Sequence, residues 1–249
     1  MLEILAITVP VFILIGLGYA AVRTAVLNEA GMRALGRFVI VFALPAMLFQ
    51  ALAQRRFDEI MNSGYLAAYA LGSLTAFSAG LVLARSLRGR DAQASVMVGM
   101  GCSMSNSAFI GLPVALQVIG PIATVAMALT MLVENLLMLP LVLALADSSG
   151  PRQGRFLASL GSTLLGLARN PLLLAIVAGF GFSITGSRLP APLFKAVDML
   201  ALASAPVALF VIGGTLAGAR VRGMFGDVAV ITVGKLLLHP AAVLWSPCC

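Results

Sequence analysis

An apolar run over residues 96–119 is long enough to cross a bilayer, yet its centre is polar and rich in helix breakers. About 20 apolar residues span the hydrocarbon core. Lipid cannot satisfy unpaired backbone groups, so an interrupted helix persists only where protein buries it or where it lines a wet cavity. The run therefore predicts a broken transmembrane helix, whose candidate substrate- or ion-binding residues include Ser103, Ser105, Asn106, Ser107, Gly111 and Pro113.

A structural interpretation of the same run is a kinked helix whose serines hydrogen-bond to carbonyls of their own turn. Asn106 favours the functional interpretation, because an amide at mid-depth requires a partner that a plain kink does not provide. Broken helices with half-helix ends at the midplane are typical of binding sites in secondary transporters.

The composition is that of an all-α polytopic membrane protein. Hydrophobic residues make up 61% of the chain, charged residues 10%, and the mean hydropathy is +1.06; soluble domains carry about 25% charged residues. The hydropathy pattern predicts eight spans, at about residues 3–22, 34–53, 64–84, 94–119, 122–146, 166–184, 196–218 and 228–245.

The net charge of +7 comes from basic residues in short loops, which the positive-inside rule explains without a nucleic-acid partner. Eleven lie in alternate loops: Arg23, Arg33, Arg37, Arg85, Arg88, Arg90, Arg152, Arg155, Arg169, Arg220 and Arg222. The opposite loops hold four, Arg55, Arg56, Arg188 and Lys195. This asymmetry predicts a multi-pass protein whose N-terminus lies outside.

Cysteine and histidine usage predicts neither a cofactor nor a metal. Cys102 lies mid-span, where a small apolar thiol is the default role, and Cys248 and Cys249 are adjacent and without a histidine cluster. The chain has one histidine and no Ser/His/Asp set, so a membrane enzyme is the weakest functional class.

The chain resembles itself at an offset of 161 residues. Residues 10–19 resemble 171–180, and residues 44–49 resemble 205–210. The offset separates spans that are five apart, and an odd number inverts the second unit in the membrane, as in many secondary carriers. The predicted divisions are a first five-helix repeat, a cytoplasmic linker and an incomplete second repeat, over residues 1–146, 147–165 and 166–249.

The repeat places Pro45 and Pro206 in equivalent spans. A proline inside a helix removes a backbone hydrogen bond and clashes with the preceding turn. Each is as consistent with a packing kink as with a mechanistic hinge, so both enter the set of site candidates.

Ionisable groups within other spans extend the candidate site. Glu134 and Asn135 lie halfway along the fifth predicted span, where an ionisable residue marks an ion or substrate pathway. Proton carriage is one role for Glu134. Lys235 and His239 are four residues apart in the eighth span and hence on one helical face.

These segments resemble the auxin efflux carrier family of membrane transporters, in its bacterial form. Phe38–Phe49, Asn106–Pro113 and Lys235–Pro240 carry the likeness, which extends to about residue 242. The pattern Asn-x-x-Phe-x-Gly-x-Pro is the most specific part and adds Phe109 to the candidate residues.

The resemblance implies a fold like that of bile-acid and sodium–proton carriers, with ten spans in two inverted five-helix units and crossed, broken helices at the centre. It implies transport of small organic anions, such as dicarboxylates or auxin-like acids, across the inner membrane of a bacterium. Coupling to a proton or a sodium ion and assembly as a homodimer remain open at this point.

The chain departs from the family pattern at its end. Adding 161 to Asn106 places a second broken helix near position 267, beyond Cys249. We therefore expect a C-terminally truncated carrier with an open groove beside Asn106. The alternative function is an inactive fragment or a non-transporting, receptor-like membrane protein.

Overall fold

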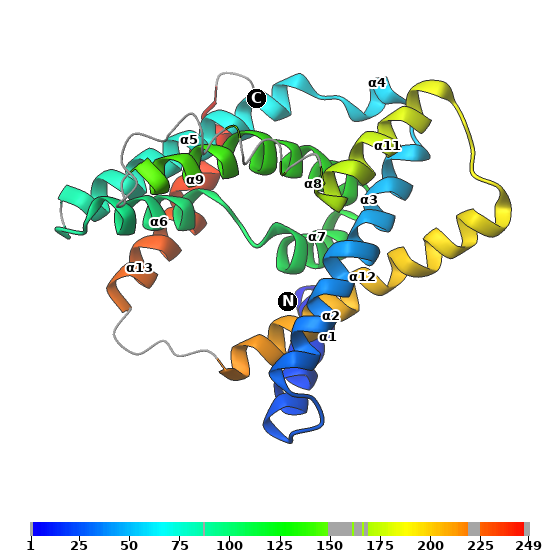
Figure 1. Ribbon diagram of the computed structural model, residues 1–249, viewed down its shortest axis with the longest axis horizontal. Coiled ribbons are helices and arrows are strands. Elements are labelled where there is room, and N and C mark those ends of the chain that lie inside the picture. The colour runs from blue at the N-terminus through cyan, green and yellow to red at the C-terminus, as the bar shows by residue number, and fades with distance from the viewer. Residues whose placement is uncertain are drawn as a thin grey trace. The chain divides into compact units, whose positions relative to one another are not determined.

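The computed structural model describes residues 2–86, 88–148, 161, 166, 169–218 and 225–246, and the regular elements over those ranges are helices (Figure 1). The predicted all-α class is confirmed. Six helical stretches are long and apolar enough to cross a membrane: Glu29–Ala53, Phe57–Ser86, Ala92–Ile119, Ile122–Ala146, Ala191–Gly218 and Gly226–Leu244.

The first predicted span coincides with α1, and the sixth coincides with α11, a shorter apolar helix. α1 is Leu2–Arg23, of which Val9–Arg23 is the part whose side chains are described. α11 is Pro171–Thr185, so the predicted start near residue 166 is wrong. Proline is favoured at a first helical position because its missing N–H would have no partner there.

The chain divides into two compact units. Unit 1 comprises Met1–Met61, Asn106–Ala128 and Pro171–Arg220. Its elements are α1, α2 (Glu29–Phe38), η1 (Val39–Ala43), α3 (Leu44–Ala53), α4 (Phe57–Ile60), η2 (Ser107–Gly111), α7 (Leu112–Ile119), the start of α8 (Ile122–Val133), α11 and α12 (Ala191–Gly218). Within it α1 packs along α12, and α3 packs along α11 (Figure 1).

Glycine lets the helices of these two pairs approach closely. A Cβ added to Gly18 of α1 would overlap the carbonyl oxygen of Phe210 in α12. A Cβ on Gly179 of α11 would lie 2.8 Å from the Leu52 Cβ and 3.3 Å from the Phe49 oxygen of α3. Small residues at helix crossings are how membrane helices gain van der Waals contact.

Unit 2 comprises Asn62–Ser105, Leu129–Asn170 and Val221–Cys249. Its elements are α5 (Ser63–Ser86), α6 (Ala92–Ser103), the end of α8, η3 (Glu134–Met138), α9 (Leu139–Ser148), α13 (Phe225–Val233), η4 (Gly234–Leu238) and α14 (His239–Leu244). α5 packs on α6 and α14, and α6 also packs on α9 and α13.

Cys102 is buried in unit 2, as expected of a small apolar thiol. Its sulfur lies 2.7 and 2.6 Å from the positions that a Cβ on Gly80 or Gly234 would take, and its thiol donates to the Val230 carbonyl at 3.7 Å. Cys248 and Cys249 lie outside the described residues.

The two units are not the two predicted repeats. Each unit takes residues from both predicted repeats, because α11 and α12 join unit 1 whereas α13 and α14 join unit 2. The predicted linker, 147–165, lies almost wholly outside the described residues.

Four spans contain a five-residue π-helical segment, and in each case a proline is the second residue after it. The segments η1, η2, η3 and η4 precede Pro45, Pro113, Pro140 and Pro240. Proline cannot donate to the carbonyl four residues earlier and clashes with it, and a wider turn relieves that clash. π-turns are frequent at functional sites.

Pro10 and Pro206 differ, because both lie inside regular α-helix. Pro206 is exposed on α12, whereas Pro45 is half-buried and follows η1. The two prolines that the sequence repeat aligns therefore have different local backbones.

Candidate functional site

The predicted helix break is present and is shorter than expected. α6 ends at Ser103, residues 104–106 are non-helical, and the helix resumes through η2 and α7. Asn106 has φ −78° and ψ 59°, which is the inverse γ-turn conformation common where loops begin. Its carbonyl accepts the amides of Ile110 and Gly111 at 3.0 and 3.2 Å, so the π-turn starts at the break.

In unit 2, one peptide unit at the break is held by two charged side chains. The Lys235 ammonium donates to the Met104 carbonyl. The amide of Ser105, on the other side of the same peptide bond, donates to Glu134 Oε1 at 3.5 Å, a long contact. A cation at the carbonyl end of α6 also opposes the negative end of the helix dipole.

Glu134 is only 4% exposed, although it lies within a span. It begins the π-turn η3, and its Oε1 accepts from the Tyr69 hydroxyl at 2.9 Å. Lys235 and Glu134 both contact the Met104–Ser105 peptide unit, and a buried carboxylate is tolerated where it accepts hydrogen bonds.

His239 continues this cluster on the side of α5. Its Nε2 lies 3.0 Å from the Ser73 hydroxyl, and its ring meets the Tyr69 ring edge-on at 5.3 Å. Lys235 and His239 were predicted to share a face, and they contact different neighbours, the end of α6 and the middle of α5. We call Tyr69, Ser73, Glu134, Lys235 and His239 the ionisable cluster.

Both ends of the Asn135 side-chain amide are hydrogen-bonded within unit 2. Its Nδ2 donates to the Met131 carbonyl one turn earlier at 2.9 Å, and its Oδ1 accepts from Asn170 at 3.3 Å. Ser103 is likewise engaged, because its hydroxyl donates to the Gly99 carbonyl at 3.1 Å. For Ser103 the structural interpretation of the serine-rich run is the observed one.

The remaining candidates of the broken span belong to unit 1, since the boundary between units falls at Ser105–Asn106. Over the described ranges the Asn106 side chain has no hydrogen-bond partner, and it is exposed. Gly111 is exposed, Phe109 is half-buried and Pro113 is buried.

The sequence analysis missed Tyr69, Ser73 and the Met104 carbonyl. A signal for the first two was available: Tyr65, Tyr69 and Ser73 recur every four residues, which places their hydroxyls on one face of α5. Tyr65 extends this stripe to Thr130, with 2.8 Å between the hydroxyl oxygens. Nothing in the sequence indicates which carbonyl receives the lysine.

Comparison with known proteins identifies relatives along almost the whole chain. A family model described as "Membrane transport protein" matches residues 4–246. A "putative malonate transporter" of Rhizobium meliloti is 29% identical over 241 residues, covering 96% of this chain and 75% of that protein. The "uncharacterized transporter YfdV" of Escherichia coli is 26% identical over 239 residues, with 94% and 75% covered.

The relatives are transporters and not enzymes, and they come from bacteria. The family match agrees with the residues that carry the resemblance, namely the proline-marked second span, the broken fourth span and the Lys-x-x-x-His-Pro segment. The chain is a multi-pass membrane protein and belongs to the auxin efflux carrier family of membrane transport proteins.

Proposed function

We propose that this protein is a secondary transporter of small organic anions, with the ionisable cluster and the broken helix as its binding machinery. The observation that carries the proposal is the arrangement at the Met104–Ser105 peptide unit, where Lys235 and Glu134 meet the same break from opposite sides. Charged groups within a span are expensive and mark transport pathways.

A substrate carboxylate would compete with the Met104 carbonyl for the Lys235 ammonium. A carboxylate is the better acceptor, because its full negative charge attracts the ammonium more strongly than the dipole of a neutral carbonyl does. Substrate binding would thus exchange one partner of Lys235 for another without leaving the ammonium unpaired. Loss of the Lys235 contact at the break couples binding to the conformation of α6.

Glu134 is the group that would carry a coupling proton. Its carboxylate accepts from Tyr69 and from the Ser105 amide, so a proton on it removes one acceptor from the break. Protonation and substrate binding would then act on the same peptide unit, which is the physical requirement for coupled transport. Sodium is the alternative coupling ion.

The substrate class follows from the cluster and from a relative. One cation and several hydroxyls suit a compact carboxylate. The relative from Rhizobium meliloti bears the name of a malonate transporter, and malonate is a dicarboxylate of that kind. We therefore propose dicarboxylates first and auxin-like acids second.

The inverted repeat belongs to the same proposal, and the glycine contacts of unit 1 support it. Gly18 lies against Phe210, and Gly179 lies against Phe49. The two glycines differ by 161 residues and so do the two phenylalanines, which is the offset found in the sequence. An exchange of the two repeats would carry one contact onto the other, because α1 pairs with α12 as α11 pairs with α3.

The site of action would be the bacterial inner membrane, with the N-terminus outside, as the distribution of basic loop residues predicts. Labelling of single cysteines introduced at Thr24 and Ser187 by a membrane-impermeant maleimide tests this orientation. We expect selective labelling at Ser187 in intact cells. Selective labelling at Thr24 would show that the orientation is the opposite one.

Flux of labelled malonate into proteoliposomes tests the function. We expect uptake by the wild-type chain and a loss of about tenfold or more for Asn106→Ala, because a hydrogen bond to a charged ligand is worth about 1.5–3 kcal/mol. Gln117→Ala is the matched control, since Gln117 is an exposed amide of the same span. Equal flux from wild type and Asn106→Ala would remove Asn106 from the site.

A further inference from the structure

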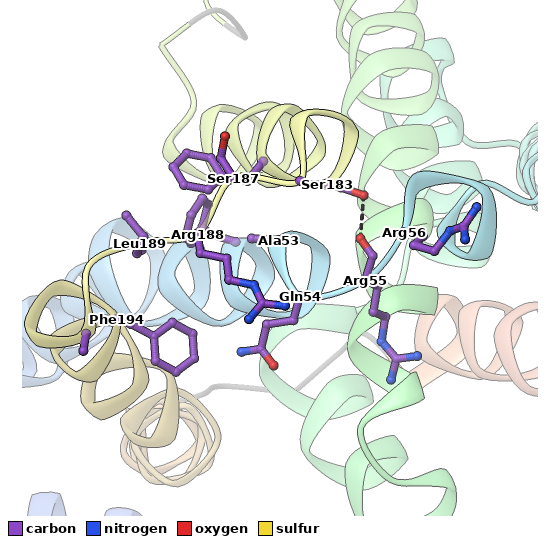
Figure 2. A pocket seen from close by; sticks show the side chains of 13 residues that line it. Ala53, Gln54, Arg55, Arg56, Ser183, Ser187, Arg188, Leu189 and Phe194 are labelled. Carbon is purple, nitrogen blue, oxygen red and sulfur yellow. Dashed lines mark hydrogen bonds between the residues drawn. The ribbon is translucent and has the colours of Figure 1, made fainter.

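A cavity of about 640 Å³ opens in unit 1 where the end of α3, the end of α11 and the start of α12 meet (Figure 2). Sites for small molecules measure roughly 300–1,000 Å³. Three arginine residues, Arg55, Arg56 and Arg188, line it together with Gln54 and Ser187. We call it the arginine cavity.

Local sequence explains how the cavity is held open. α11 ends at Thr185, and Gly186 at φ +64° reverses the chain, as glycine commonly does after a helix. The Ser183 hydroxyl donates to the Arg55 carbonyl at 2.6 Å, which joins the end of α11 to the chain after α3 (Figure 2). The rings of Phe49 and Phe182 line the cavity and pack edge-on, with 5.2 Å between their centroids.

The charges around the cavity do not cancel. Arg56 is engaged by both carboxylate oxygens of Asp58, at 3.1 Å each, and this hydrogen bonding holds the pKa of Arg56 above its ordinary value. Lys195 pairs with Asp198 at 3.2 Å. Neither Arg55 nor Arg188 has an ion-pair partner over the ranges that the structure describes, and Arg188 extends toward Gln54 (Figure 2).

These arginines are also the exceptions to the charge rule for loops. The sequence assigns four basic residues to the outer side, against eleven inside. Three of those four line the arginine cavity, and the fourth, Lys195, follows the lining residue Phe194. Orientation in the membrane does not require cations there, so their gathering around one cavity indicates a ligand of opposite charge.

We propose that the arginine cavity binds a small organic dianion, with Arg55 and Arg188 as the carboxylate-binding groups. The phenylalanines that line the cavity, Phe49, Phe182 and Phe194, would contact the apolar middle of the ligand. Guanidinium matches carboxylate through two parallel hydrogen bonds.

The inference rests on the proposed function for its choice of malonate as the ligand, and it assigns that ligand a capture site of its own. The arginine cavity lies entirely within unit 1, whereas the ionisable cluster lies entirely within unit 2. Binding at the cavity can therefore be measured apart from transport.

The test is equilibrium binding of labelled malonate to the purified full chain in phosphatidylcholine nanodiscs. We expect the double variant Arg55→Gln/Arg188→Gln to raise the Kd about tenfold or more, and Arg55→Lys/Arg188→Lys to recover part of the affinity. Arg56→Gln is the matched control, because Asp58 already occupies that guanidinium, and it should change the Kd by less than about twofold. Equal melting temperatures exclude unfolding as the cause.

Two further arms separate this inference from the proposed function. Glu134→Gln should lower malonate flux and leave malonate binding at the arginine cavity unchanged. Malonate binding that does not change in Arg55→Gln/Arg188→Gln, with flux retained by the wild type, overturns the inference alone. Absence of malonate binding by the wild type also overturns it. The third contrary outcome is that the arginine cavity binds phosphatidylglycerol through its arginines and does not bind malonate. The cavity would then be a site for a lipid headgroup.

Discussion

Unit 1 and unit 2 solve the problem of packing in a membrane differently. In unit 1 the described acidic and basic side chains are exposed or half-exposed, and the helix pairs rely on glycine against backbone. Unit 2 also packs through glycine, and it buries Glu134 and His239 as well. Unit 1 thus keeps its described charged side chains out of its core, whereas unit 2 buries two ionisable side chains.

This difference separates stability from function. A glycine contact is defined by distance, so any added atom must displace a backbone, and the damage appears as loss of the folded protein. A buried charge pair is worth little net stability, because desolvation offsets its attraction. Under the proposed function, the ionisable side chains buried in unit 2 serve transport and contribute little to folding.

The largest effect should come from breaking the helix pairs of unit 1. Gly18→Ala places a methyl group on the Phe210 carbonyl, and Gly179→Ala crowds Leu52 and Phe49. Each should destabilise by about 3 kcal/mol or more, the upper range for overpacking, with a drop in membrane yield and melting temperature.

Two neighbouring glycines serve as controls, because Gly16 and Gly181 have open space where a Cβ would stand. Gly16→Ala and Gly181→Ala should leave yield and melting unchanged. Wild-type melting of Gly18→Ala would show that the pairing of α1 with α12 is wrong, and wild-type melting of Gly179→Ala would show the same for α11 with α3.

The second effect concerns unit 2 and should leave folding nearly intact. Lys235→Met and Glu134→Gln should each lower malonate flux about tenfold to a hundredfold, because hydrogen bonds to charged groups contribute about 1.5–3 kcal/mol. In the double variant the losses should fail to add by at least about 0.5 kcal/mol, as expected of residues in one network.

Lys195→Met in unit 1 is the matched lysine control, since its pair with Asp198 is exposed and weak. It should change flux by less than about twofold. Strictly additive losses for Lys235→Met and Glu134→Gln would show that the two side chains do not act on the same peptide unit.

The smallest effect should come from proline. Pro113→Ala restores a donor for the Phe109 carbonyl and favours ordinary α-helix over η2 by about 1 kcal/mol, one hydrogen bond. Flux should fall about fivefold, and amide exchange should slow at residues 109–113. Pro206→Ala, in a regular helix, should alter neither flux nor amide exchange. An equal response from the two proline variants would show that the effect of Pro113 does not depend on the π-turn.

The sequence predicted the class, most spans and the break, because each is a local pattern of hydropathy and helix breakers. It located Glu134 as a buried carboxylate for the same reason. It could not predict that Met104 supplies the carbonyl for Lys235, since that contact joins residues 131 apart and depends on how α6 and η4 pack. It also could not predict the two units, because α12 and α13 are neighbours in the chain and belong to different units.

The proline-linked segments have a geometric consequence for movement. A π-turn closes its hydrogen bond one residue later than an α-turn, so each of η1 to η4 holds one surplus residue. Conversion of such a turn to α-helix would rotate the rest of the span by roughly 100° about its axis, the angle that one residue subtends. Such a conversion would rotate the part of a span beyond the π-turn, while the part before the π-turn keeps its contacts.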